Sequence, residues 1–215
     1  MQENTSTFAD REDAGIRLGE TLADTGIKAD LVLAIPRGGV PVALMVAEKF
    51  QLPLKLYLVR KIGHPFNDEY AIGAVTENEL LLNASEKPDS IYLNATIQKE
   101  RERIREMKDK FGHEATRKDI LGKKIILVDD GIATGTCIQL AIKEIRKMGA
   151  AEIIVAAPVC PSATKETIRQ SADKIIILKT PPHFVGIGAY FADFSQLTDN
   201  QVMELTKRSP EKATK

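Results

Sequence analysis

The stretch from Ile125 to Cys137 reads IILVDDGIATGTC, and it decides the fold. Its first four residues are apolar and predict a buried strand, which ends at two adjacent acids, Asp129 and Asp130. Ligands of open parallel sheets bind at the carboxyl ends of the strands, so this position favours function. Two neighbouring carboxylates repel each other unless they face hydroxyl donors, a metal ion or a positively charged transition state.

The residues after the two acids predict a phosphate-binding loop. Gly131 to Gly135 are mostly small, so the backbone can approach an anion closely, and a helix with unpaired N–H groups follows at once. The helix is indicated by the shared face of Ile138, Ala141, Ile142, Ile145 and Met148. Carboxylates beside such a loop suit a sugar phosphate, with the acids on the hydroxyls and the loop on the phosphate.

The rest of the chain alternates short apolar runs with helical patterns. The runs LVLAI, LPLKLYLVR, AEIIVAAPV and KIIIL are apolar on both faces, which is typical of parallel strands covered by helices on both sides. We therefore expect an α/β fold with a doubly wound, mostly parallel sheet. The predicted domain covers residues 1–205, with a small C-terminal hood at about 180–200 and a disordered tail at 206–215.

Two segments between the second and third apolar runs are less regular. The sequence KIGHPFNDEY predicts a mobile polar loop, and AIGAVTENELLLN predicts two strands joined by a turn at Glu77 to Glu79. A long helix follows in IYLNATIQKERERIREMKDKFG. Its arginines alternate with acids and lack aromatic partners, so they indicate a solvated helix face rather than a nucleic-acid site.

Composition narrows the class of partner. The 215 residues contain 30 Lys and Arg and 30 Asp and Glu, so the overall charge favours neither nucleic acid nor an anionic membrane. Cys137 and Cys160 have no metal-ligand spacing and no disulfide framework, as expected in a reducing compartment. The polar, acidic N-terminus lacks the features of a secretory signal, and no apolar run approaches ~20 residues. We expect a cytoplasmic protein that binds small molecules.

IILVDDGIATGTC resembles the 5-phosphoribosyl-1-pyrophosphate (PRPP) binding motif of type I phosphoribosyltransferases. The resemblance implies that Asp129 and Asp130 hold the ribose hydroxyls and favour the positive charge of the transition state. It places the 5-phosphate on the loop formed by Gly131, Ile132, Ala133, Thr134, Gly135, Thr136 and Cys137. The family usually has Thr or Ser at the position of Cys137, and a thiol is a poorer hydrogen-bond donor, so we expect weaker phosphate binding.

Three further stretches match the family in chain order. In AIPRGGVPVA, Arg37, Gly38 and Gly39 occupy the place of a pyrophosphate-binding loop that often has strained peptide geometry; an ordinary strand-helix turn is the alternative. In LVRKIGHPF, the pair Arg60 and Lys61 is similar to the start of a flexible catalytic loop. Lys61, and with less support Arg60 and His64, would neutralise the departing pyrophosphate, although a lone loop lysine is often merely solvated.

The third stretch, PPHFVGIGAYFADFSQ, resembles the family's hood over the acceptor. The resemblance implies that Phe184 and Val185 contact the acceptor and that Asp193 contacts magnesium, with local core packing as the alternative for the aromatic residues. The combination of PRGGVPVA, VRKIG, AIGAV, VDDGIATG and DFSQ resembles an uncharacterised group of phosphoribosyltransferases.

The resemblance implies a Mg²⁺-dependent transferase that moves the 5-phosphoribosyl group from PRPP to a nitrogen acceptor and releases pyrophosphate. The expected acceptor is a nucleobase. Asp129, Asp130 and Lys61 would be the catalytic residues, Mg²⁺ would bind mainly through substrate oxygens, and the protein would be a homodimer. A non-catalytic regulator that binds PRPP or a nucleotide on the same fold is the alternative. A Rossmann enzyme is disfavoured because no GxGxxG follows the first strand.

Overall fold

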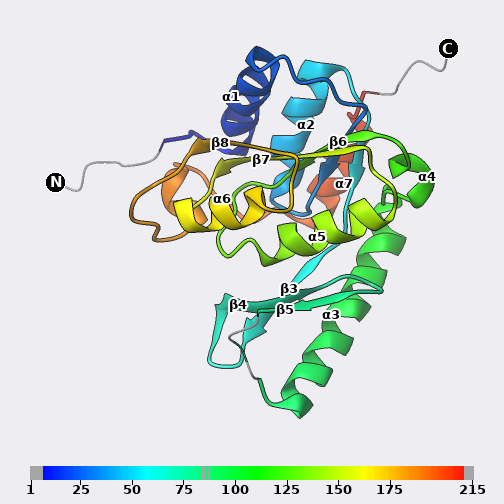
Figure 1. Cartoon of the computed structure of the whole chain (residues 1–215), viewed down its shortest axis with the longest axis vertical. Coiled ribbons are helices and arrows are strands. Elements are labelled where there is room, and N and C mark those ends of the chain that lie inside the picture. Colours follow the sequence, from blue (N-terminus) through cyan, green and yellow to red (C-terminus); the bar gives the residue numbers. More distant parts are fainter. Residues whose placement is uncertain (1–6, 84–85, 87, 211–215) are drawn as a thin grey trace.

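The computed structural model describes residues 7–83, 86 and 88–210, and its elements are arranged around a parallel sheet (Figure 1). The sheet strands are β1 (Leu31–Ala34), β2 (Leu54–Leu56), β6 (Lys124–Val128), β7 (Glu152–Val159) and β8 (Lys174–Lys179). The helices around it are α1 (Arg11–Asp24), α2 (Gly39–Phe50), α4 (Arg117–Ile120), α5 (Thr136–Lys147), α6 (Ser162–Arg169) and α7 (Asp199–Lys207), with the short 3₁₀ helix η1 (Ile187–Tyr190).

The five strands lie in the order β2-β1-β6-β7-β8, and every neighbouring pair is parallel. The order reverses between β1 and β6, where Leu31 pairs with Ile125 and Ala34 with Val128. In an open α/β sheet, such a switch point leaves a crevice at the carboxyl ends of the two strands. The Arg37–Gly39 turn follows β1 and the Asp129–Cys137 loop follows β6, so both segments lie at this crevice.

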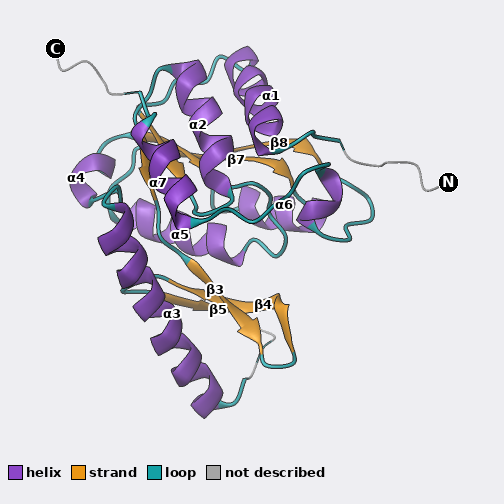
Figure 2. Cartoon of the chain, turned by 180° about the vertical axis from the view of Figure 1, so that it is seen from behind, coloured by secondary structure: helices purple, strands orange, loops and turns teal. Residues whose placement is uncertain are grey.

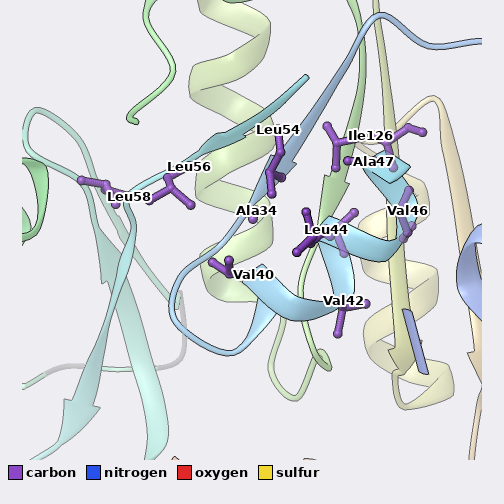
Figure 3. Packing of buried hydrophobic residues seen from close by; sticks show 14 of the residues in the cluster. Ala34, Val40, Val42, Leu44, Val46, Ala47, Leu54, Leu56, Leu58 and Ile126 are labelled. Carbon is purple, nitrogen blue, oxygen red and sulfur yellow. The ribbon is translucent and has the colours of Figure 1, made fainter. Parts of the chain in front are cut away.

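Alternate residues of each central strand feed two cores on opposite faces of the sheet. Val32 and Ala34 of β1 pack with α1, α2 and α7, whereas Leu31 and Leu33 pack with α5 and α6. Figure 3 shows the first of these cores, in which Leu44 of α2 lies among the apolar side chains of the sheet. Helices therefore cover both faces, and the predicted doubly wound α/β fold is confirmed.

A second, three-stranded antiparallel sheet projects from the core together with a long helix (Figures 1 and 2). Its elements are β3 (Arg60–His64), β4 (Asn67–Val75), β5 (Leu80–Leu82) and the helix α3 (Ser90–Phe111), which together we call the arm. The turn predicted at Glu77 to Glu79 lies between β4 and β5 as expected. The prediction of a loop for KIGHPFNDEY is wrong, because this segment forms most of a hairpin made of β3 and β4.

The strand signal in that hairpin is hidden by residues that are rare in strands. Gly, Pro, Asn and Asp interrupt the alternation, and the pairing register shifts on both sides of Gly63. The strands nevertheless have an apolar face, since Ile62 and Ile72 are fully buried in the core shared with α3. Tertiary packing therefore overrides the local sequence preference.

The C-terminal segment ends later than expected. Helix α7 continues through Lys207, Thr206 is buried, and the Ser209 hydroxyl accepts a hydrogen bond from the backbone N–H of Leu54 at 2.8 Å. The boundary at 205 is therefore corrected to at least 209, because α7 packs against α2. Residues 211–215 of the expected tail lie outside the described residues. Within the described part of the chain, the helices are too short or too polar to cross a membrane.

Candidate active site at the carboxyl edge of the sheet

The two acids follow β6 and differ in their surroundings. Asp130 is buried, whereas Asp129 is half-buried, and the backbone N–H of Asp130 donates to Asp129 Oδ1 at 2.9 Å. Burial raises the pKa of Asp129 well above its ordinary value, and the neighbouring charge of Asp130 adds to the rise. Burial also raises the pKa of Asp130, against the opposing charge of Arg11. The pair is therefore held in a costly state that a ligand with hydroxyl donors would relieve.

Arg11, the first residue of α1, reaches Asp130 from the other end of the chain. Its Nε donates to Asp130 Oδ2 at 2.8 Å, and one terminal nitrogen donates to the carbonyl of Ser195 at 2.9 Å. The side chains of Arg11 and Asp130 are 11% and 12% exposed, so water screens this ion pair little. No motif in the sequence singled out Arg11, so this residue was missed.

The Arg37–Gly39 turn lies directly against the acids. A Cβ added to Gly38 would overlap the carboxylate of Asp130, and one on Gly39 would stand 3.0 Å from the Cα of Asp129. Only glycine fits at position 38, and a side chain at position 39 would crowd the end of β6. The peptide bond between Pro36 and Arg37 is cis, in line with the unusual peptide geometry expected at this turn.

Arg37 is exposed at this turn and interacts with the start of α7. One of its terminal nitrogens lies 3.4 Å from Asp199 Oδ1, and Lys110 Nζ lies 2.7 Å from the other oxygen of the same carboxylate. The Arg37 guanidinium therefore has a carboxylate partner, which an incoming pyrophosphate would have to replace.

The loop predicted to bind phosphate has the backbone geometry for that task. Gly135 is the N-cap of α5, adopts φ of 77° and provides no side-chain cap, so the first N–H groups of the helix stay available to an anion. Ala133 and Thr134 are exposed. Gly131, Ile132, Gly135 and Thr136 are buried and hold the loop in place, with the backbone N–H of Ile132 donating to the carbonyl of Val159 at 2.9 Å.

Side chains from two other segments secure the loop. The hydroxyl of Thr164 in α6 donates to the carbonyl of Ala133 at 2.8 Å. The hydroxyl of Thr136 donates to Asn83 Oδ1 at 3.1 Å and lies 3.2 Å from the hydroxyl of Thr134. Asn83 directly follows β5, so the arm contacts the loop that we expect to hold phosphate. The sequence carried no signal for this contact, because it depends on how the arm packs.

Cys137 is half-buried in the first turn of α5. Burial raises the pKa of its thiol to about 12, and the charge of Asp129 adds to the rise. This direction favours a neutral thiol and argues against a reactive thiolate at this helix N-terminus. The positive charges of Arg60 and Lys61 act in the opposite direction, so both residues lie close enough to the loop to influence it.

Arg60 and Lys61 lie on β3 rather than on a free loop. Arg60 Nε lies 2.9 Å from Oε2 of Glu100, a buried residue of α3, and Arg103 donates to the other oxygen of that carboxylate at 2.6 Å. Lys61 pairs across the sheet with Ala74. His64 lies at the hairpin tip, where its Nδ1 accepts a hydrogen bond from the backbone N–H of Phe66 at 3.2 Å.

The three hood residues fall in different surroundings. Phe184 stacks on Tyr190 with ring centres 6.1 Å apart, which makes it part of a local aromatic cluster. Val185 is 82% exposed. Asp193 accepts hydrogen bonds from the backbone and hydroxyl of Ser195, and these bonds lower its pKa.

The hood also covers the start of the predicted phosphate loop. A Cβ on Gly131 would overlap the side chain of Ile187, the first residue of η1. This contact was not predicted, since Ile187 carries no polar signal.

A cavity of about 510 Å³ opens beside Arg11. It is lined by Asp10, Arg11, Glu12, Pro41, Asp193, Ser195, Gln196, Leu197, Asn200, Gln201, Glu204 and Leu205.

The structure thus brings three predicted segments to one edge of the sheet: the acids with their loop, the Arg37–Gly39 turn, and the strand with Arg60 and Lys61. Asp193 has its own partner in Ser195, and Phe184 packs within the hood. Among the described residues, no three or more His, Cys, Asp or Glu side chains are grouped to hold a metal ion.

Open parallel α/β sheets bind their ligands at the switch point, and in this chain the acid pair and the loop that leads into α5 lie at that point. The family model described as "Phosphoribosyl transferase domain" matches residues 5–191. The chain belongs to this family, so the resemblance seen in the sequence is confirmed.

Relatives agree with that assignment. A Mycobacterium tuberculosis protein provisionally named a phosphoribosyl transferase is 35% identical over 207 residues, which are 94% of this chain and 47% of the relative. An amidophosphoribosyltransferase of Rhizobium etli is 27% identical over 148 residues, 69% of this chain and 23% of that protein. The chain spans about half, or less, of the length of these curated relatives.

One solved structure is similar over almost its whole length. The crystal structure of the protein TT1426 from Thermus thermophilus has a TM-score of 0.77 and 35% sequence identity. The match covers 95% of this chain and 99% of that one. The fold of this chain is therefore shared by a solved relative.

Proposed function

We propose that this protein transfers the 5-phosphoribosyl group of PRPP to a nitrogen acceptor, with a nucleobase as the first candidate, and releases pyrophosphate. One observation carries the proposal. The Asp129–Asp130 pair and the uncapped start of α5 lie on one continuous loop at the switch point, where hydroxyls and a phosphate of one pentose can be bound together.

In this reaction the acceptor nitrogen forms a bond to the anomeric carbon as the bond to the pyrophosphate oxygen breaks. The sugar passes through an oxocarbenium-like state of the kind that glycosidases stabilise. Asp129 suits the stabilisation of that positive charge, because the ion pairs of the described residues include none on its carboxylate, whereas Asp130 is paired with Arg11. Asp130 is better suited to orient the ribose.

Positive charge for the departing pyrophosphate would come from the Arg37–Gly39 turn and from Lys61. Gly38 and Gly39 carry no side chain, so the backbone of this turn can approach an anion closely. Mg²⁺ fits the donor set here, since it prefers carboxylate, phosphate and water oxygens and keeps several waters. When bound, it would neutralise the pyrophosphate and would be held mainly through substrate oxygens.

A second candidate is a PRPP- or nucleotide-binding regulator on the same fold. It is favoured by the ion pairs of Arg37 with Asp199 and of Arg60 with Glu100, which occupy two cations expected at the pyrophosphate. Such a protein would bind the sugar phosphate without turning it over.

The two candidates are separated by measuring pyrophosphate release from PRPP and Mg²⁺ with a panel of nucleobases, alongside PRPP affinity by calorimetry. Binding with acceptor-dependent release supports the transferase, and binding without release supports the regulator. The control is the double variant D129N/D130N, which we expect to lose both signals. If the wild type neither binds PRPP nor releases pyrophosphate, both candidates are wrong.

A further inference from the structure

Arg11 occupies an electrostatically unfavourable place in its own helix. It is the first residue of α1, where the backbone N–H groups carry partial positive charge. Glu12 and Asp13, which follow it, suit that end of the helix, but a guanidinium does not. Its position is therefore better explained by its contacts outside the helix.

Those contacts involve two nitrogens and the flat face of the guanidinium group. Nε donates to Asp130, a terminal nitrogen donates to the carbonyl of Ser195, and the central carbon lies 3.8 Å from the centre of the Phe194 ring. A planar fork of donors that also stacks on an aromatic ring is a property of arginine, and lysine cannot reproduce it. Arg11 therefore joins the beginning of the chain, the acid after β6 and the hood.

Asp130 is confined on several sides. Arg11 holds its Oδ2, the backbone of Gly38 lies against the same carboxylate, and its own N–H is bonded to Asp129. The carboxylate of Asp129 also interacts with it, so these contacts restrict how the Asp130 carboxylate can turn. A buried carboxylate beside a second one costs free energy, and the Arg11 charge offsets part of that cost.

We propose that Arg11 is a positioning residue, which neutralises Asp130, fixes its orientation toward the ligand and couples this acid to the hood at Phe194 and Ser195. The identity of the ligand as PRPP rests on the proposed function, whereas the control of Asp130 by Arg11 can be measured without any ligand. The coupling implies that displacement of the hood also displaces an acid of the site.

The same helix provides a matched control in Arg17. Arg17 Nε lies 3.0 Å from Asp13 Oδ1, a terminal nitrogen donates to the carbonyl of Thr7 at 3.2 Å, and its central carbon lies 5.6 Å from the Phe8 ring centre. It thus has the same three kinds of partner as Arg11. Its carboxylate partner Asp13 is half-buried and lies on the same helix, so removal of Arg17 tests the general effect of losing such an arginine.

The first measurement is an NMR titration of the ligand-free protein with ¹³C-labelled aspartate carboxyls, in which D130N identifies the Asp130 resonance. We expect Asp130 to titrate at higher pH in R11M than in the wild type, because a neighbouring positive charge is lost. R11K keeps the charge and should titrate close to the wild type, as should R17M. If R11M does not fold, R11Q gives the same comparison. An identical Asp130 titration in the wild type and the uncharged variant would overturn the proposal.

The second measurement is the affinity for PRPP with Mg²⁺ by calorimetry between pH 5.5 and 8. R11M should lose affinity at least ~10-fold, with a larger loss at the acid end, R11K should recover part of it, and R17M should match the wild type. Equal affinities for R11M and the wild type would refute the positioning role. A wild type that fails to bind PRPP would instead refute the proposed function, while the titration still decides whether Arg11 controls Asp130.

Discussion

The candidate site has two halves that are built in different ways. One half is continuous in the chain: Asp129 to Cys137 run from the end of β6 into the first turn of α5. The other half is assembled from distant segments, in which Arg11, the Arg37–Gly39 turn and the hood at Phe194 and Ser195 meet around Asp130. In the proposed reaction, the continuous half binds the ribose and its phosphate, whereas the assembled half holds Asp130 in place and adds the turn expected at the pyrophosphate.

The difference between the halves predicts which substitutions affect ligand binding alone and which also affect the stability of the fold. In the continuous half, strand end, loop and helix start set the geometry locally, so polar substitutions there should alter ligand binding with little effect on folding. In the assembled half, each contact also joins parts of the tertiary structure, so substitutions should affect binding and stability together. Single substitutions in each half test that contrast.

The largest effect is expected from Asp129→Asn in the continuous half. The change removes the negative charge that we expect to stabilise the positively charged transition state, so turnover of PRPP should fall at least ~100-fold. Steady-state kinetics measure the loss, and circular dichroism should show an unchanged fold. Asp24→Asn at the exposed end of α1 is the control. Kinetics like those of the wild type in D129N would contradict the role given to this acid.

Gly38→Ala tests the assembled half. The added Cβ would overlap Asp130 Oδ2, so either the turn or the carboxylate must move. We expect a loss of PRPP affinity of ~10-fold or more together with a destabilisation of about 1–3 kcal/mol, as for an overpacked site. Calorimetry and denaturant unfolding check the two effects. Gly19→Ala, on a helix away from the acids, should leave the affinity unchanged, and a G38A variant that keeps both properties would break the contrast.

Cys137→Ser should strengthen phosphate binding by the continuous half. The thiol is neutral and a weak donor, and a hydroxyl at the same place can donate to the phosphate. One added hydrogen bond corresponds to about 0.5–1.5 kcal/mol, so PRPP affinity should rise ~2- to 10-fold in calorimetry. Cys160→Ser, at the other free cysteine, is the control. A lower affinity in C137S would show that the thiol is not a deficit in this loop.

The smallest effect is a gain in stability of the ligand-free D129N protein. Because the pKa of Asp129 is higher in the folded than in the unfolded chain, the folded state binds the proton more tightly. The unfolding free energy of the wild type therefore falls as pH rises from the ordinary value near 4 through the folded pKa, and this loss persists above it.

The amide of D129N does not titrate, so its advantage over the wild type should grow across the same pH window. Thermal unfolding should show a higher Tm by about 2–4 °C at pH 8, which corresponds to about 1 kcal/mol for a chain of this size. An advantage that shrinks as pH rises would contradict the direction of the pKa shift.

The same contrast explains how much the sequence revealed. Local patterns were sufficient for the α/β class, the acid pair and its loop, because apolar runs, a Gly-rich turn and a helix start are read along a short stretch. The hairpin at β3 and β4 was missed, since its strand character depends on burial against α3.

The long-range contacts in the site could also not be predicted from the sequence. Arg11 and Ser195 lie 184 residues apart, and Thr136 and Asn83 lie 53 residues apart. Ile187 covers Gly131 through shape alone. A basic residue at the start of a helix was the one signal that pointed to Arg11, and it acquires meaning only once Asp130 is placed beside it.

The most direct test of the central claim is a crystal structure of the protein with PRPP and Mg²⁺. We predict that the ribose hydroxyls lie within hydrogen-bond distance of Asp129 and Asp130 and that the 5-phosphate sits on the backbone N–H groups of residues 133–137. Density for PRPP at another place, or an empty loop at a saturating concentration, would contradict the account.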